Sequence, residues 1–286
     1  MKAKAFVKLT RIEHSFMLIV AVLTAELLAK APVPYWKYAL SIIPPVLISA
    51  SAFAINNYYD VESDEINKRT DNPIVVGEVS RKEALYVAVA FFALGSLISL
   101  PLGALPFLIV VLFGILSLLY SYKMKNILLV GNLYIALSMS IPFIYGSIIS
   151  ISYVDYQNLL IFVIVLLSGL AREIHGTIRD LSGDIRARNA MTLPRLIGAK
   201  GSSEIACSLY LIAIAISAVL FLKVAPFKFN LVYLPFVIAA NSLLIYASII
   251  FLKEKKEEYR KARNMSLLGM AIALIGFFAS ALFYVP

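Results

Sequence analysis

The chain has 286 residues, of which 61% are hydrophobic and 15% are charged, and the apolar residues lie in long runs. Runs of this length can cross a lipid bilayer, so the composition excludes a water-soluble globular domain and predicts a polytopic membrane protein. The net charge of +9 lies mainly between the runs, which argues against nucleic-acid binding.

We predict an all-α membrane helical bundle of nine transmembrane helices that forms a single intramembrane domain over residues 1–286. The nine apolar runs are 13–30, 38–57, 83–101, 104–122, 127–150, 157–175, 204–222, 229–252 and 265–285. Of the 26 Lys and Arg residues, all but four precede the first run or lie in even-numbered connections. The positive-inside rule therefore predicts a multi-pass protein of the cell membrane with a cytoplasmic N-terminus.

The first two runs carry polar residues at their cytoplasmic ends. Arg11 precedes the first run, where it could anchor the chain at the membrane surface or contact an anionic substrate. The second run leads directly into Asn56, Asp60 and Asp64, which we call the first acidic motif. Their spacing of four residues places them on one face of a helix, where the two carboxylates repel unless something positive lies beside them.

Polar and charged residues mark the connections that follow. Ser80 and Glu83 have the spacing of a capping box and predict the start of the third span. Lys123 and Lys125 follow the fourth span, either as phosphate contacts beside the first acidic motif or as markers of membrane topology. The segment 253–263 alternates in charge and predicts a solvated helical extension on the cytoplasmic side.

The sixth span repeats the pattern of the second. Arg172, Asp180 and Asp184 again lie on a four-residue ladder, and the two aspartates, which we call the second acidic motif, each follow an aspartate of the first by 120 residues. Four spans per repeat is an even number, so both motifs are expected at the same, cytoplasmic face. The predicted internal repeat is parallel, with halves at about 10–125 and 126–252 and an extra ninth helix at 265–285.

The two acidic motifs together suggest metal and phosphate chemistry. Four carboxylates at one membrane face form an oxygen-only ligand set of the kind that Mg²⁺ prefers. Protein-bound Mg²⁺ usually completes its coordination with water and substrate phosphate oxygens, so acid pairs near Lys and Arg imply a diphosphate between them. The surrounding apolar spans imply a lipid tail on that diphosphate. The sequence therefore predicts a prenyl diphosphate as substrate, whose cleavage would give an allylic cation for a carbon or oxygen nucleophile to capture.

At these residues the sequence resembles the intramembrane prenyltransferases of the UbiA superfamily, whose motifs read Asn-Asp-x-x-Asp-x-x-x-Asp and Asp-x-x-x-Asp at two cytoplasmic helix ends of a nine-helix, twofold repeated bundle. The resemblance implies Mg²⁺-dependent prenyl transfer at the cytoplasmic face, with four catalytic aspartates that bind the metal together with Asn56. These aspartates are Asp60, Asp64, Asp180 and Asp184. Substrate contacts implied by the resemblance are Asn56, Lys68, Arg69 and the Tyr120 to Lys125 segment, which contains Lys123.

Three departures from the family pattern concern the residues around the motifs. Asn57 stands where the family often has Asp, and Asn72 stands where an Arg often precedes a Pro-Ile pair. A Gly-Thr pair that begins at Gly176 stands where a Lys is expected, so that Arg179 or His175 would have to compensate.

The acceptor is predicted from a shorter stretch. The Arg172-Glu173-Ile174 run most resembles an archaeal branch of the family that adds geranylgeranyl to geranylgeranylglyceryl phosphate in ether-lipid synthesis. A phosphate on the acceptor would use extra positive charge, for which Arg11, Arg172 and Lys125 are candidates. The resemblance thus implies a prenyl diphosphate and a lipid-phosphate acceptor as substrates, among membrane lipids and without nucleic acid. It leaves the oligomeric state open.

Three alternatives to this interpretation remain. One is prenylation of an aromatic acceptor such as 4-hydroxybenzoate in quinone synthesis. Another is a cation-coupled transporter, although the acidic sites of such carriers usually lie near the bilayer midplane rather than at one face. The last is a structural scaffold in which the acid pairs only neutralise neighbouring Lys and Arg.

Overall fold

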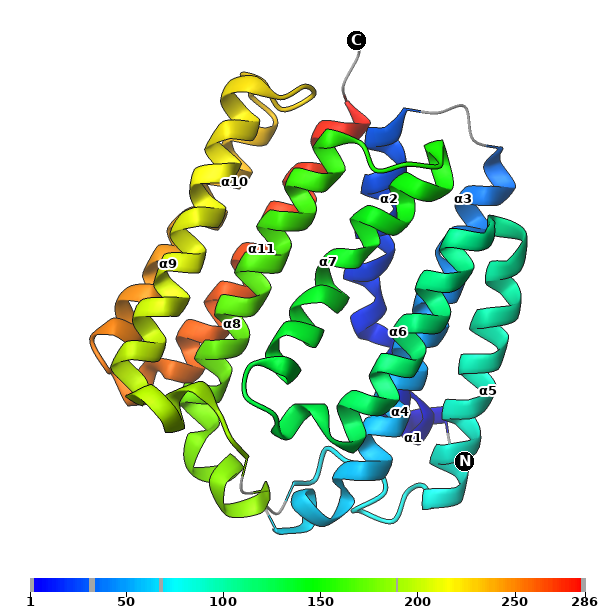
Figure 1. Ribbon diagram of the computed structural model, residues 1–286, viewed down its shortest axis with the longest axis vertical. Helices are drawn as coiled ribbons and strands as arrows, with labels where there is room; N and C mark the ends of the chain where they lie inside the picture. Colours follow the sequence, from blue (N-terminus) through cyan, green and yellow to red (C-terminus); the bar gives the residue numbers. More distant parts are fainter. Residues whose placement is uncertain (1–2, 31–33, 67–68, 189, 284–286) are drawn as a thin grey trace.

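The computed structural model describes residues 3–30, 34–66, 69–188 and 190–283, with the side chains of all of these except 14 and 182–188 (Figure 1). The regular structure of this part of the chain is helical. The α-helices are α1 (Ala3–Thr10), α2 (Ser15–Ala29), α3 (Tyr35–Ser41), α4 (Ile43–Ile66), α5 (Arg81–Ser99), α6 (Ala104–Tyr122), α7 (Val130–Ile151), α8 (Tyr156–Arg188), α9 (Leu193–Lys223), α10 (Tyr233–Leu252) and α11 (Tyr259–Leu282).

The helices confirm a polytopic integral membrane protein. Within the described residues, eight segments are long and apolar enough to cross a membrane, and the bent pair of α1 and α2 raises the number to as many as nine. Each predicted span overlaps one helix, or in the case of α3 and α4 a pair of helices. The interruption between α3 and α4 precedes Pro44 and Pro45, whose rings cannot continue a regular hydrogen-bond ladder.

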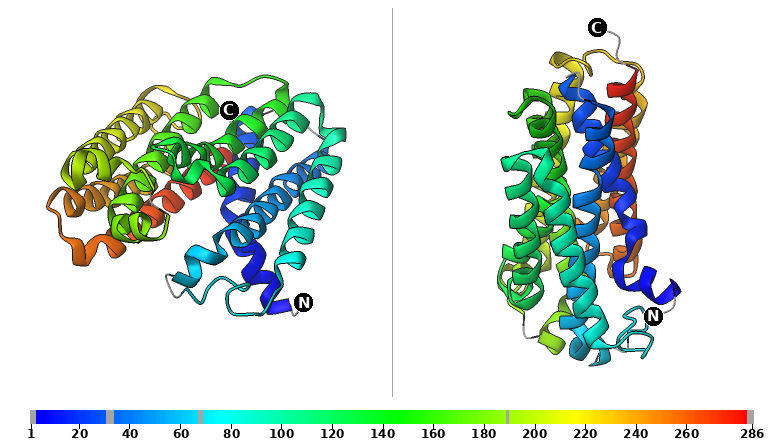
Figure 2. Two further views of the ribbon diagram at one scale, coloured as in Figure 1. Left: turned by 60° about the horizontal axis from the view of Figure 1, so that its bottom comes forward. Right: turned by 90° about the vertical axis from the view of Figure 1, so that its right-hand side faces the viewer.

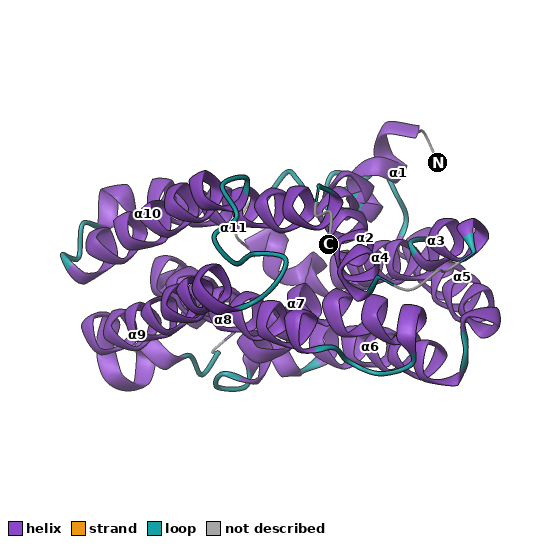
Figure 3. Ribbon diagram, turned by 90° about the horizontal axis from the view of Figure 1, so that it is seen from above, coloured by secondary structure: helices purple, strands orange, loops and turns teal. Residues whose placement is uncertain are grey.

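The helices form two rows when the bundle is seen along its axis. One row contains α9, α8, α7 and α6, and the other contains α10, α11, α2 and α4, with α5 at the outer edge (Figure 3). The side view shows that the helices of both rows lie nearly parallel to one long axis (Figure 2). Helices α4 and α8 end at the same end of the bundle, which we call the motif end (Figure 1).

Close packing holds the two rows together. Gly146 of α7 lies so near α2 that a Cβ atom there would be 2.8 Å from the carbonyl oxygen of Val22. Such small-residue contacts replace the hydrophobic driving force that helices lack inside a bilayer. At the far end, an aromatic cluster of Phe227, Tyr233 and Phe277 joins α10 and α11 to the α9–α10 connection.

Helix boundaries confirm one sequence prediction and correct two. The Ser80–Glu83 capping box is formed, with the Glu83 carboxylate 2.8 Å from the Ser80 backbone nitrogen. The predicted helical extension over 253–263 is wrong for its first part, because α10 ends at Leu252 and positive φ at Glu254 starts a turn. Helix α9 begins at Leu193, eleven residues before the predicted span, and bends at Gly198, where φ is 79°. Pro194 is compatible with this start because a helix's first turn has no partner for its N–H groups.

Candidate active site

A cavity of about 790 Å³ runs through the bundle and is lined mainly by apolar side chains. At the motif end its lining includes Arg11, Asn56 and Tyr120. Towards the far end it includes Phe277 and Tyr233, the first residue of α10. The cavity therefore covers most of the length of the bundle, and its walls and size suit a long hydrocarbon chain.

The first acidic motif lies on α4 at the mouth of this cavity. The helix continues without a break from its apolar part through Asp64 to Ile66, as the sequence predicts. Asp60 accepts a hydrogen bond from Asn56 Nδ2 at 2.9 Å and forms an ion pair with Lys125 from the connection after α6. Both charged side chains are largely buried, with 13% of Asp60 and 8% of Lys125 exposed. A buried carboxylate is thus neutralised by a cation brought from the next helical hairpin.

Asp64, one turn after Asp60, is held by the connection between α4 and α5. Its Oδ2 accepts a hydrogen bond from Asn72 Nδ2 at 2.9 Å, and its Oδ1 lies 3.3 Å from Arg69 NH1. Asp71 joins this group to the N-terminal segment, since its two carboxylate oxygens lie 3.7 Å from Arg69 Nε and 3.0 Å from Arg11 NH2. Charges from three parts of the chain therefore meet at the mouth of the cavity.

Two of the departures from the family pattern shape this mouth. Asn57 is 5% exposed, and its side-chain amide donates to the carbonyl oxygens of Leu9 and Phe53 at 3.1 Å and 3.0 Å. An aspartate could not donate these bonds when ionised. Asn72 is 1% exposed and donates to the Asn57 carbonyl at 3.1 Å as well as to Asp64. Both asparagines therefore position the motif through the hydrogen bonds that they donate, and an ionised aspartate at position 57 would not reproduce them.

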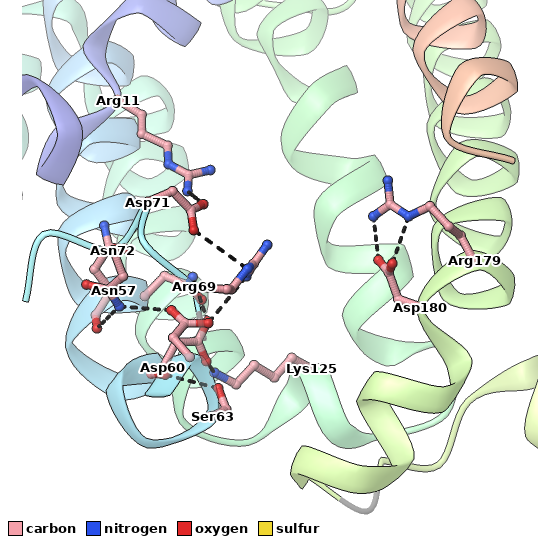
Figure 4. Close-up of polar contacts among 12 residues, drawn as sticks. Arg11, Asn57, Asp60, Ser63, Arg69, Asp71, Asn72, Lys125, Arg179 and Asp180 are labelled. Atoms are coloured by element: carbon pink, nitrogen blue, oxygen red, sulfur yellow. Dashed lines mark hydrogen bonds and ion pairs between the residues drawn. The ribbon is translucent and has the colours of Figure 1, made fainter. Parts of the chain in front are cut away.

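The second acidic motif lies across the mouth on α8, which extends through it to Arg188. Asp180 is half exposed and pairs with Arg179, whose Nε is 2.7 Å from Asp180 Oδ1 (Figure 4). The side chain of Asp184 and all of Lys68 lie outside the described residues. Among the described side chains, no three carboxylate, histidine or cysteine groups are close enough to hold a metal ion by themselves. A metal site shared by both motifs stays a prediction.

The remaining predicted contact residues differ in their surroundings. Arg172 lines the cavity, and its NH1 lies 2.9 Å from Glu173 Oε1. Lys123 is exposed at the end of α6 and is not part of the cavity lining. His175 is fully buried in the core, where its ring stacks on Phe251 with the centroids 3.8 Å apart. His175 therefore faces an aromatic core, whereas Arg179 pairs directly with the second acidic motif.

Sequence reasoning missed Asp71, Glu173 and Arg263 as parts of the site. Arg263 belongs to the segment that charge alternation marks as solvated, yet it lines the cavity and contacts Glu173 from α11. Its place directly before the last apolar run is the signal that could have found it, because arginines inside membrane helices usually face the bundle interior.

Comparison with known proteins identifies relatives of this chain. The profile of the UbiA prenyltransferase family matches residues 17–283. A digeranylgeranylglyceryl phosphate synthase of Archaeoglobus fulgidus is 35% identical over 283 residues, which are 97% of this chain and 95% of the relative. A protein of the same name from Methanothermobacter thermautotrophicus is 32% identical, with 92% of each chain covered.

Solved structures agree with this relationship. A structure described as giving insights into digeranylgeranylglyceryl phosphate synthase in membranes superimposes with a TM-score of 0.79, at 26% identity and over 98% of this chain and 99% of that one. A UbiA homologue from Archaeoglobus fulgidus bound to GPP and Mg²⁺ has the same fold, with a TM-score of 0.67 at 18% identity over 96% and 99% of the two chains. Sequence, fold and site thus lead to one conclusion: this chain belongs to the UbiA prenyltransferase family.

Proposed function

We propose that this membrane prenyltransferase transfers a geranylgeranyl group from geranylgeranyl diphosphate to the glycerol hydroxyl of geranylgeranylglyceryl phosphate, a step of archaeal ether-lipid synthesis. The family membership sets aside the transporter and the scaffold. The observation that carries the acceptor assignment is that relatives of 30–35% identity over nearly the whole chain are named digeranylgeranylglyceryl phosphate synthase. The long apolar cavity with charged groups at its mouth supports a diphosphate head and a prenyl tail in one site.

The mouth of the cavity suits Mg²⁺ and a diphosphate. Asn56, Asp60 and Asp64 offer oxygen ligands from one helix, and Asp180 and Asp184 are proposed to offer more from α8. Mg²⁺ generally needs only one or two carboxylates besides substrate phosphates, so the carboxylates of the two motifs would be sufficient for this role. When bound, Mg²⁺ would stabilise the negative charge of the departing diphosphate.

The present ion pairs indicate how the protein's own cations would act. Lys125 neutralises Asp60, and Arg69 neutralises Asp64, so both carboxylates are already balanced. With Mg²⁺ held by the carboxylates, Lys125 and Arg69 would be available to contact the diphosphate oxygens and stabilise the charge of the leaving group. Lys68, Lys123, Arg179 and Tyr120 are proposed as further contacts at this mouth.

The transfer itself needs few protein groups. The bond between C1 of the prenyl chain and the diphosphate oxygen breaks, and the allylic cation is captured by the acceptor hydroxyl to form an ether. We assign the released hydroxyl proton to a diphosphate oxygen, because Asp64 is a proposed Mg²⁺ ligand and also accepts a hydrogen bond from Asn72. The apolar cavity walls exclude water, which would otherwise capture the cation.

The placement of the site relative to the membrane is also part of the proposal. All but four of the 26 Lys and Arg residues precede the first span or follow even-numbered spans. This distribution supports a motif end and an N-terminus in the cytoplasm. Mg²⁺ and the charged heads of the substrates would then reach the mouth from the cytoplasm, with the lipid tails in the membrane.

The proposed function is tested by a transfer assay with purified protein, geranylgeranyl diphosphate and Mg²⁺. Geranylgeranylglyceryl phosphate and 4-hydroxybenzoate are offered in separate reactions. Product from the glyceryl phosphate alone supports the proposal, whereas product from the benzoate assigns the chain to quinone synthesis. Asp60→Asn should abolish the product, while Glu62→Gln is a matched control that removes a carboxylate 84% exposed on the same helix.

A further inference from the structure

A second charged group lies at the cavity wall away from the acidic motifs, and its two arginines line the cavity. It consists of Arg172 and Glu173 from α8 and Arg263 from α11. We call Arg172 and Arg263 the arginine pair. Glu173 Oε1 lies 2.9 Å from Arg172 NH1 and 3.3 Å from Arg263 NH2. The exposed fraction of the side chain is only 11% for Arg172, 17% for Glu173 and 20% for Arg263. Two buried cations therefore share one carboxylate oxygen.

The backbone of α8 is adapted to this arrangement. Gly176 faces the Arg263 guanidinium, and a Cβ atom there would lie 3.1 Å from Arg263 Nε. A larger residue at 176 would press against the guanidinium. Glycine thus lets a cation from α11 lie directly against α8, at the position where the family pattern leads one to expect a lysine.

The arginine pair is not satisfied by the protein. One carboxylate leaves the group with a net charge of +1, and neither Arg172 Nε nor Arg263 Nε has a hydrogen-bond partner among the described residues, although both atoms are buried. Unpaired buried donors are costly, and arginines with free donors are the usual recognition elements for phosphate. Both arginines line the large cavity, so an anion inside it can reach them.

The position of the pair separates it from the diphosphate site. Arg172 precedes Asp180 by eight residues, which is about 12 Å along the helix axis at a rise of 1.5 Å per residue. A diphosphate held by the acidic motifs leaves the arginines available to a second anion. A glyceryl phosphate acceptor supplies one, and its phosphate must lie near the reacting centre because only the glycerol carbons separate it from the hydroxyl.

We propose that Arg172 and Arg263 bind the phosphate monoester of the lipid acceptor and so place its glycerol hydroxyl towards the prenyl donor. This inference rests on the proposed function and adds a residue from α11, Arg263, to its acceptor site. Glu173 holds the two guanidinium groups in position before the acceptor arrives. The acceptor's phosphate, rather than its lipid tail alone, is then the feature that the enzyme selects.

The test measures equilibrium binding of two lipids to the purified protein without donor and Mg²⁺: geranylgeranylglyceryl phosphate and the same lipid without its phosphate. The wild type should bind the phosphate form about 10- to 100-fold more tightly than the form without phosphate, the range expected for charge-assisted hydrogen bonds. We call this quotient of the two affinities the phosphate ratio, or simply the ratio. Arg263→Met and Arg172→Met should reduce this ratio to about three or less, and Arg263→Lys should retain part of it. Arg260→Met removes an exposed arginine one turn away on α11 and should leave the ratio unchanged.

Further measurements distinguish a wrong binding site from a misfolded variant and from a wrongly assigned substrate. The double variant Arg263→Met with Glu173→Gln removes one charge of each sign and should lose the ratio while the charge balance of the group is kept. An unchanged ratio in either Arg263→Met protein would overturn the proposal, as would a loss of geranylgeranyl diphosphate binding with the ratio intact. Arginine-dependent binding without product in the transfer assay would leave this site supported and the proposed function refuted.

Discussion

At the scale of single residues, the charges at the cavity mouth are arranged in ion pairs. Lys125 is the clearest case, because its side chain is 8% exposed and its partner is Asp60, the central residue of the first acidic motif. The sequence left open whether Lys123 and Lys125 contact phosphate or mark topology. The structure separates them, since Lys123 is exposed and Lys125 is buried against Asp60.

Replacing Lys125 should therefore impair use of the prenyl diphosphate. We expect Lys125→Met to lower kcat/KM by about 100-fold, since a removed preorganised charge contact to a leaving group typically costs that much. Lys125→Arg should recover part of the activity, and Lys123→Met should have less than a tenth of the effect. Steady-state kinetics at saturating acceptor measure this. Equal losses in the two methionine variants would show that net charge at the mouth matters rather than the Asp60 contact.

The asparagines beside the motif could not be interpreted from sequence. Asn57 and Asn72 look like missing charges, but their roles depend on how the N-terminal segment and the 69–79 connection fold back onto α4. Such contacts join residues 48 and 15 positions apart and leave no local pattern. The spacing of the aspartates, by contrast, follows directly from helix geometry and could be read from the sequence alone.

Restoring the carboxylate that the family often has at position 57 should destabilise this protein. Asn57→Asp buries a charge and removes the side-chain donor from the carbonyl oxygens of Leu9 and Phe53. We therefore expect the free energy of unfolding to fall by about 2–4 kcal/mol. Thermal unfolding in detergent measures the change. Asn264→Asp introduces the same charge at an exposed position that lines the cavity, and serves as the control. A stability equal to the wild type would mean that Asn57 is interchangeable with Asp here.

At the scale of helices, composition predicted the spans but not where several of them end. The apolar runs locate the helices because each must satisfy its backbone inside the bilayer. The turn at 253–258 and the early start of α9 depend on a positive φ at Glu254 and on a bend at Gly198. Alternating charge is compatible with both helix and turn in water, so it could not distinguish them.

Packing between α2 and α7 depends on a single glycine. A Cβ atom at Gly146 would lie 2.7 Å from Ala25 Cβ and 2.8 Å from the Val22 carbonyl oxygen, and a helix backbone cannot yield as a side chain can. Gly146→Ala should thus push the helices apart and reduce stability by about 1–3 kcal/mol. Gly201→Ala, whose Cβ would meet Ile197 at an ordinary 3.4 Å, should be neutral or slightly stabilising. Melting temperatures in one detergent compare the two, and similar values would refute the close-contact argument.

At the scale of the whole molecule, the cavity is the feature that the sequence could not reveal. Its walls come from eight helices, and no motif records the space left between them. The two acidic motifs could be placed at one face because an even number of spans separates them. The parallel repeat remains a prediction, as does the joint use of Asp60, Asp64, Asp180 and Asp184 by one metal-bound substrate.

The length of the cavity leads to a prediction about the prenyl donor. Ala273 of α11 lines the cavity ten residues beyond Arg263, which is about 15 Å along the helix. A phenyl ring there would fill the far part of the space, so Ala273→Phe should favour short donors. We expect the ratio of kcat/KM for geranylgeranyl over geranyl diphosphate to fall at least about tenfold, because each buried CH₂ that is lost costs about 0.8 kcal/mol.

Ala271→Phe is the matched control, since this alanine lies two residues away on α11 and does not line the cavity. It should leave the donor ratio near that of the wild type, although both variants carry the same added volume. Competition between the two donors in one reaction measures the ratio without depending on the amount of folded enzyme. If Ala273→Phe also leaves the ratio unchanged, the prenyl chain does not extend along this part of the cavity. The far aromatic cluster would then serve packing rather than define how long a chain the enzyme accepts.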